Sequence, residues 1–111
     1  MEELKLRSRH WIVNEKGDII IGEGRCEILE NIERTGSLNQ TAKVMKMSYK
    51  GVWSKVKVTE QYLKVRLVAT DKKRGSRLTK EGKELLEKYH TLKEKCLQAD
   101  DRVFRSIFKS A

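Results

Sequence analysis

The chain has 111 residues, which suits one domain around a single modest core, so we expect residues 1–111 to form one domain. It contains no apolar run near the roughly 18 residues that cross a bilayer and no signal-peptide start, so we expect a cytoplasmic protein without a membrane partner. The two cysteines, Cys26 and Cys96, are too few and too widely spaced for a zinc site, so we expect reduced thiols and no metal or other cofactor.

The net charge of +9 is gathered in one part of the chain. Residues 43–83 hold 13 Lys or Arg against three acids, which leaves +10, whereas the remaining residues hold 12 bases against 13 acids. This concentration favours a polyanionic partner, because solubility alone does not require the charges to be gathered. A basic face that is only solvated is the alternative.

The first elements are predicted to be a β-hairpin and a helix. Residues 4–13 begin with alternating apolar and polar side chains, residues 18–21 are Asp-Ile-Ile-Ile, and Asn-Glu-Lys-Gly between them supplies turn residues. Gly-Glu-Gly at 22–24 lacks the lysine and the glycine spacing of a phosphate-binding loop and is interpreted as a turn. Residues 25–36 then repeat apolar side chains at helical intervals, and Gly36 can end that helix.

Two short helices joined by a tight turn are predicted next. Ser37 begins a capping box with the glutamine three residues later, and the helix behind it ends near Lys46. Ser48 can cap a third helix that continues towards Leu63. Small Ala42 would allow the two backbones to cross closely, which completes a helix-turn-helix pattern. Lys46 stands where this turn often has glycine, and a positive φ there would cost about 1 kcal/mol.

A basic hairpin and a long helix complete the predicted fold. Residues 65–70 are rich in β-branched side chains, a charged turn ending in glycine follows, and residues 76–79 can return as a partner strand. We therefore expect a wing over about 65–79, followed by a helix over about 80–109 that Thr79 caps. The expected fold class is mainly α with small β, a winged helix-turn-helix with an N-terminal β-hairpin, a β-wing and a long C-terminal helix.

The last helix carries an apolar seam with alternating spacings of four and three residues. Such a seam normally pairs with another helix, so we expect a C-terminal dimerisation helix, although packing on its own domain is the alternative. Phe104, Ile107 and Phe108 add apolar surface that also favours a homodimer. The predicted seam consists of Leu85, Tyr89, Leu92, Cys96, Ala99 and Val103.

The stretch from Gly22 to Val56 resembles the N-terminal DNA-binding domain of the ModE-type molybdate-responsive transcription regulators, and the similarity covers roughly residues 5–95. The recurring elements matched here are Arg25 with Leu29, Gly36-Ser37, Ala42-Lys43, Ser48-Tyr49-Lys50, Trp53 and Leu-Thr-Lys-Glu-Gly at 78–82. The resemblance implies a LysR-like winged helix-turn-helix that binds double-stranded DNA. The family's molybdate-binding module has no counterpart after residue 83, so molybdate sensing is not expected of these residues.

The predicted DNA contacts come from two helices and the wing. With Val52, Trp53 and Val56 facing inward, Lys50 is the best candidate for a guanine contact. Stacking of Trp53 on nucleic acid is the alternative to its place in the core, and capping alone would explain Ser37 and Gln40 equally well. The predicted set is Ser37, Asn39 and Gln40 on the second helix, Ser48, Tyr49, Lys50, Ser54 and Lys57 on the third, and Lys72, Lys73 and Arg74 at the wing tip.

Together these patterns predict a sequence-specific DNA-binding transcription regulator that acts as a dimer. A winged helix that contacts protein or RNA instead is the alternative function. No enzyme is expected, because His10 and His90 are not beside a nucleophile motif and Asp100-Asp101 is interpreted as an exposed acidic pair or a helix break.

Overall fold

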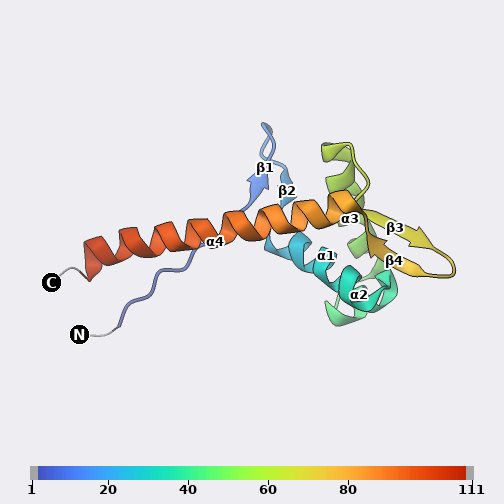
Figure 1. Ribbon diagram of the computed structural model, residues 1–111, viewed down its shortest axis with the longest axis horizontal. Helices are drawn as coiled ribbons and strands as arrows, with labels where there is room; N and C mark the ends of the chain where they lie inside the picture. Colours follow the sequence, from blue (N-terminus) through green and yellow to red (C-terminus); the bar gives the residue numbers. More distant parts are fainter. Residues whose placement is uncertain (1–2, 110–111) are drawn as a thin grey trace.

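The computed structural model describes residues 3–109, in which the helix-turn-helix and the wing lie at the N-terminal end of a long final helix (Figure 1). The strands β1 (Ile12–Val13) and β2 (Ile19–Ile21) are followed by α1 (Glu23–Thr35), α2 (Leu38–Val44), α3 (Tyr49–Leu63), the strands β3 (Val68–Asp71) and β4 (Gly75–Leu78), and α4 (Lys80–Phe108). This order confirms the predicted fold class, a mainly α winged helix-turn-helix with an N-terminal hairpin.

The N-terminal hairpin is shorter than predicted. β1 pairs antiparallel with β2 through Ile12 and Val13 only, and residues 3–11 lie outside any strand. The reason is that the chain before β1 runs beside α4 instead of along β2 (Figure 1). The hydroxyl of Tyr89 donates a 2.9 Å hydrogen bond to the carbonyl oxygen of His10, which holds this segment on the helix.

The turn between α1 and α2 forms where the sequence predicts it, with a different hydrogen-bond partner. Gly36 ends α1 with a φ of 71°, and the Ser37 hydroxyl oxygen accepts a 3.1 Å hydrogen bond from the backbone N–H of Gln40. The reciprocal half of the predicted capping box is wrong, because the N–H of Ser37 donates to the hydroxyl of Thr35 at 3.2 Å rather than to the Gln40 side chain. The hydroxyl of Thr35 thus accepts the hydrogen bond that was expected to go to the Gln40 side chain.

The turn between α2 and α3 has the predicted geometry. Lys46 adopts a φ of 54°, and the next N–H, that of Met47, donates to the carbonyl oxygen of Ala42 at 2.9 Å. Ser48 caps α3 by accepting a 2.9 Å hydrogen bond from the N–H of Gly51. Ala42 is buried at this crossing, as its small side chain suggested.

The core lies between α1, α2, α3 and the base of the wing. Each fully buried aliphatic side chain contributes about 1.5–3 kcal/mol, so these contacts dominate the stability of the fold. Val52 and Val56 point inward from α3 as predicted, and Trp53 packs partly buried against the same cluster. The buried apolar side chains include Ile21, Ile28, Leu29, Ile32, Leu38, Val52, Val56, Leu67, Val68 and Leu78.

The wing is tied to the helices at its base. β3 and β4 pair in regular antiparallel register from Val68 opposite Leu78 to Asp71 opposite Gly75. The N–H of Ser76 donates a 2.9 Å hydrogen bond to the carbonyl oxygen of Gly36, so β4 docks on the α1–α2 turn. Thr79 then caps α4 as predicted, accepting from the N–H of the residue three positions on at 3.0 Å.

The predicted apolar seam of α4 has two different surroundings. Leu85 packs against the domain core and Tyr89 is only 2% exposed, so the alternative of packing on the chain's own domain holds for these two residues. The assignment of Tyr89 to a dimer seam is therefore corrected, because Tyr89 fills the interior between α4 and α1. Further along, Leu92 and Val103 are 38% and 58% exposed, and Cys96 and Ala99 are half-buried.

Among helices of residues 3–109, none combines the length and apolarity that crossing a membrane requires.

Candidate nucleic-acid interface

The first two turns of α3 present polar side chains on the face opposite the core. Lys50 and Ser54 are exposed, and Tyr49 is 48% exposed. Val52 and Val56 on the other side of the helix are fully buried, which fixes the rotation of α3 about its axis. The polar side chains can therefore contact a partner while the buried face of α3 stays packed in the core.

The ammonium group of Lys57 makes contacts within the domain that the sequence did not predict. Its Nζ atom lies 3.1 Å from Oε1 of Glu60 and 4.4 Å from the centre of the Trp53 ring. Both contacts draw the ammonium group back along α3, although the side chain keeps 37% exposure. Trp53 is half-buried beneath it, in agreement with a place at the edge of the core.

The beginning of α2 supplies three of the predicted side chains. Ser37 is half-buried with its hydroxyl engaged as the helix cap, and a phosphate contact by the same residue stays a prediction. Gln40 contributes its backbone N–H to the cap, which leaves its side chain exposed next to that of Asn39. Lys46, predicted from the sequence only as a strained turn residue, also has an exposed side chain between α2 and α3.

The wing tip carries the remaining predicted residues. Lys72, Lys73 and Arg74 are all exposed, and the turn is held by a 2.8 Å hydrogen bond from the N–H of Lys73 to Oδ1 of Asp71. In Figure 1 the wing projects from the end of the molecule opposite the C-terminus, beside α2. Since β4 is hydrogen-bonded to the α1–α2 turn, the wing and the start of α2 belong to one end of the molecule.

One of the three acids within residues 43–83, Glu60, weakens the positive field of this end little. Glu60 is buried at 6% exposure, and its Oε2 accepts hydrogen bonds from the N–H groups of Leu67 and Val68 at 2.7 and 3.2 Å. Burial by itself would raise the pKa of Glu60, but the two N–H donors and Lys57 outweigh it and hold the pKa below its ordinary value. The charge of Glu60 is thus already compensated inside the domain, and the exposed lysines and arginines dominate the surface.

Comparison with known families gives a match over more than half of the chain. The sequence pattern of the family described as "Bacterial regulatory helix-turn-helix protein, lysR family" matches residues 24–83. The chain is also 32% identical over 87 residues to the "Molybdenum transport protein ModE" of Azotobacter vinelandii, a match that takes in 75% of this chain. The chain spans only 32% of the length of that curated relative.

Solved structures share the fold. The crystal structure of the CbnR_DBD–DNA complex superposes with a TM-score of 0.61 at 21% identity, over 76% of this chain and 95% of that one. The structure of CbnR, described as a LysR family transcriptional regulator, gives a TM-score of 0.59 at 22% identity over 74% of this chain and 28% of that one. Full-length CbnR complexed with its target DNA gives 0.60 with the same identity and the same two shares.

Proposed function

Because the chain belongs to the lysR family of bacterial regulatory helix-turn-helix proteins, we propose that it is a transcription regulator that binds double-stranded DNA sequence-specifically as a homodimer. The observation that carries the proposal is the exposed Lys50 and Ser54 face of α3, held rigid by the buried Val52 and Val56. The partner class is supported by the similar CbnR structures, which are described as complexes with DNA.

The mechanism follows from a helix that enters the major groove by its N-terminal turns. Lys50 stands there as a donor for the O6 and N7 atoms of guanine, while Tyr49 and Ser54 suit either base edges or phosphates. Asn39 and Gln40 on α2 and the Ser48 cap suit the flanking phosphates, which set the depth and register of α3 without reading sequence. Lys57, which is drawn back by Glu60 and Trp53, suits a phosphate contact rather than a base contact.

The wing extends the same surface. Lys72, Lys73 and Arg74 are exposed on a hairpin that is fixed to the α1–α2 turn, so they suit the backbone or the minor groove beside the main contact. Because these contacts would neutralise phosphates, they would strengthen binding to every sequence and make it depend on salt.

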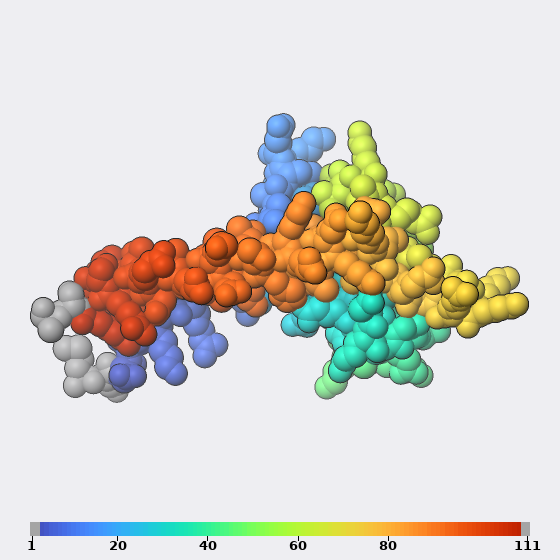
Figure 2. All heavy atoms as spheres, viewed as in Figure 1, coloured from blue at the N-terminus to red at the C-terminus, as the bar shows by residue number. Residues whose placement is uncertain are grey.

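A dimer is proposed because one copy offers a small interface. A single DNA-binding module buries about 600–1,000 Å², whereas specific affinities near 10⁻⁸ M or better usually come from larger or paired interfaces. In Figure 2 the C-terminal part of α4 extends beyond the other helices, with the N-terminal segment beside it. Its side chains Val103, Ile107 and Phe108 are 58%, 65% and 60% exposed, which suits contact with a second copy.

The proposal assigns no reaction to the chain. His10 faces the carboxylate of Asp100 at 3.6 Å, and His90 faces that of Glu30 at 2.9 Å. The thiol nearest to His90 belongs to Cys26, whose pKa is raised to about 12 by burial and by the Glu30 carboxylate. A thiol with that pKa is protonated at neutral pH and does not act as a nucleophile.

The proposal is tested by selecting duplexes from random DNA with the wild-type chain, with Lys50→Ala and with Lys88→Ala, a lysine exposed on α4 outside the interface. The wild type should enrich a site with two half-sites related by a dyad. Lys50→Ala should bind that site about 10- to 100-fold more weakly and relax the preference at one position of each half-site, whereas Lys88→Ala should select the same site. Failure of the wild type to enrich any sequence, or an unchanged preference in Lys50→Ala, would favour the protein- or RNA-binding alternative.

A further inference from the structure

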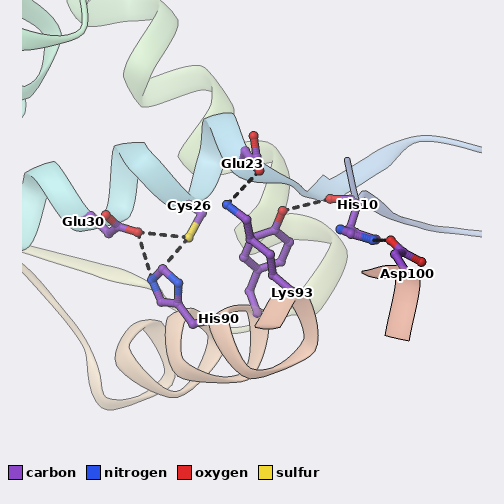
Figure 3. Close-up of polar contacts among 8 residues, drawn as sticks. His10, Glu23, Cys26, Glu30, His90, Lys93 and Asp100 are labelled. Carbon is purple, nitrogen blue, oxygen red and sulfur yellow. Dashed lines mark hydrogen bonds and ion pairs between the residues drawn. The ribbon is translucent and has the colours of Figure 1, made fainter. Parts of the chain in front are cut away.

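Three side chains of different chemistry converge between α1 and α4, on the side of α1 away from α3 (Figure 3). Cys26 and Glu30 lie one turn apart on α1, and His90 reaches them from α4. Sγ of Cys26 lies 3.4 Å from Oε1 of Glu30 and 3.8 Å from Nε2 of His90, and the last two atoms are 2.9 Å apart. Each residue therefore contributes one donor atom to a common point.

Hydrogen bonds can satisfy both donors of this triangle, but they leave one of its edges without a proton. If Nε2 of His90 carries a proton and donates it to Glu30, the thiol proton of Cys26 can also reach that carboxylate, but no proton remains between sulfur and nitrogen. If instead the thiol donates to Nε2, the lone pair of the imidazole is used and the carboxylate faces it without a proton. A cation at the centre would instead be ligated by all three atoms at once.

The geometry also differs from that of a catalytic Cys-His-Glu arrangement. There the histidine uses one ring nitrogen for the nucleophile and the other for the carboxylate. Here the same atom, Nε2 of His90, faces both the sulfur of Cys26 and the oxygen of Glu30. Convergence of single atoms on one point is the requirement for metal ligation, not for a proton relay.

From this convergence we infer that Cys26, Glu30 and His90 form a binding site for a zinc-class divalent cation. Thiolate, imidazole and carboxylate are all zinc ligands, and bond lengths of about 2.0–2.3 Å at a tetrahedral centre place the donor atoms about 3.3–3.6 Å apart. The 3.4 Å separation of Cys26 and Glu30 lies within this range, and the 3.8 and 2.9 Å separations depart from it by a few tenths of an ångström, which rotation of the exposed Glu30 and His90 side chains can supply. A soft thiolate with an imidazole favours Zn²⁺ or Co²⁺ over Mg²⁺ or Ca²⁺.

The exposure of two of the three ligands would let a bound ion exchange with solvent. Cys26 is buried at 3% exposure, whereas the side chains of Glu30 and His90 are 44% and 53% exposed, so solvent can deliver the ion and water can fill a fourth position. On binding, the Cys26 thiol loses its proton to solvent and its sulfur bonds to the metal, while His90 binds as neutral imidazole. The ammonium group of Lys93, whose charge acts on Cys26, is paired with Glu23 at 2.8 Å rather than with the carboxylate of Glu30.

The proposed site would fasten α4 to the helix-turn-helix domain. Its ligands are 64 residues apart in the chain, so a bound ion would close a long loop and add a link beside the Tyr89 contact. An ion that binds only the folded chain raises the midpoint of thermal unfolding, by roughly 10 °C when it is present at a hundredfold excess over its dissociation constant. This inference does not depend on DNA binding, and its test contains no DNA.

The test is a titration of the full, reduced chain, free of any histidine tag, with Co²⁺ and then with Zn²⁺. One Co²⁺ per chain should bind, with a thiolate-to-cobalt charge-transfer band in the near ultraviolet and the intense visible bands of tetrahedral cobalt, and Zn²⁺ should remove both. Cys26→Ser should abolish the charge-transfer band. His90→Gln, at a half-exposed position where folding is preserved, should weaken binding by more than the about 10- to 100-fold that loss of an outer-shell partner costs.

The matched controls are Cys96→Ser and His10→Gln, which remove the other thiol and the other imidazole of the chain. Both should bind Co²⁺ as the wild type does, and Zn²⁺ should raise the midpoint of thermal unfolding in both. The inference is overturned if the wild type shows no charge-transfer band, if His90→Gln binds Co²⁺ with wild-type affinity, or if Cys96→Ser loses the band while Cys26→Ser keeps it. Circular dichroism of each variant without metal verifies that the helices are intact.

Discussion

Oε2 of Glu60 lies 2.7 Å from the backbone nitrogen of Leu67, and this contact joins the end of α3 to the chain that enters the wing. The same oxygen accepts from the N–H of Val68 at 3.2 Å, and Lys57 lies beside the other oxygen. A single buried carboxylate therefore ties the end of α3 to the base of the wing. Leu67 directly precedes β3 and Val68 is its first residue, so Glu60 supplies the acceptor for both N–H groups where the chain enters the wing.

Replacing Glu60 by glutamine should lower the free energy of unfolding by about 1–3 kcal/mol at pH 7, because hydrogen bonds to a charged acceptor are lost at a buried position. Chemical denaturation of the variant and the wild type measures this difference. Glu87→Gln, on the exposed part of α4, is the matched control and should change stability by less than about 0.5 kcal/mol. Equal effects of the two changes would show that the Leu67 contact contributes nothing particular.

The same carboxylate makes stability depend on acid. The folded-state pKa of Glu60 is lowered, so its stabilisation is fully present above the unfolded-state pKa of about 4.3 and is lost as the pH falls through the lower folded-state pKa. Denaturation curves recorded between neutral and acidic pH should therefore converge for the wild type and Glu60→Gln. A difference that stays constant over the whole range would contradict the assignment.

Replacing Lys46 by glycine should stabilise the chain by about 0.5–1 kcal/mol. Its φ of 54° lies in the left-handed region, where a side chain costs about 1 kcal/mol that glycine avoids, although glycine also adds freedom to the unfolded chain. Lys43→Gly removes the same charge inside α2 and should destabilise by about 1 kcal/mol. The two changes should thus have opposite signs in thermal unfolding, and a loss of stability in both would refute the strain argument.

The wing should control salt dependence more than sequence preference. If each copy neutralises about four phosphates, the log–log slope of DNA affinity against salt is near −7 for the dimer. Changing Lys72, Lys73 and Arg74 to alanine should make this slope shallower by about 2–4 while the selected sequence stays the same. Removal of the same charge on α4, by Lys88→Ala, Lys95→Ala and Arg102→Ala, should leave the slope within about 1 of the wild type. A wild-type slope shallower than about −2 would already exclude the proposed interface.

The sequence predicted those features of the fold that depend on neighbouring residues. Ser37, Ser48 and Thr79 cap helices where their spacing indicated, because a cap needs only a hydroxyl and an N–H two or three positions on. Gly36 and Lys46 adopt the positive φ values that their turns demand. The exposed face of α3 also follows from helical periodicity, so Lys50 and Ser54 could be placed on the surface without coordinates.

Features that depend on distant contacts were missed. The N-terminal residues were predicted to extend a strand, but the docking of His10 on Tyr89 draws them along α4, and no local pattern encodes that choice. Tyr89 fits the α4 seam by spacing, yet it is buried against α1. The prediction that the chain lacks a zinc site rested on counting cysteines and stays untested; it did not weigh Glu30, one turn from Cys26, or His90 on another helix, from which the cation site is proposed. An i, i+4 Cys-Glu pair on one helix face is the only local signal of that cluster.

Two glutamates on the projecting part of α4 should abolish the proposed homodimer. Val103 and Ile107 are 58% and 65% exposed and lie one turn apart, and a second copy packed there would have to bury both new charges without partners. Val103→Glu with Ile107→Glu should therefore be monomeric in sedimentation or light scattering, at concentrations where the wild type is a dimer, with the domain core intact. Thr91→Glu with Gln98→Glu adds the same charge at exposed polar positions of α4 that lie off the predicted seam, and it should remain dimeric. If the control dissociates as well, the effect is a general repulsion between helices. If the wild type is monomeric at all concentrations, or if the double glutamate variant still dimerises, this part of α4 does not form the dimer contact.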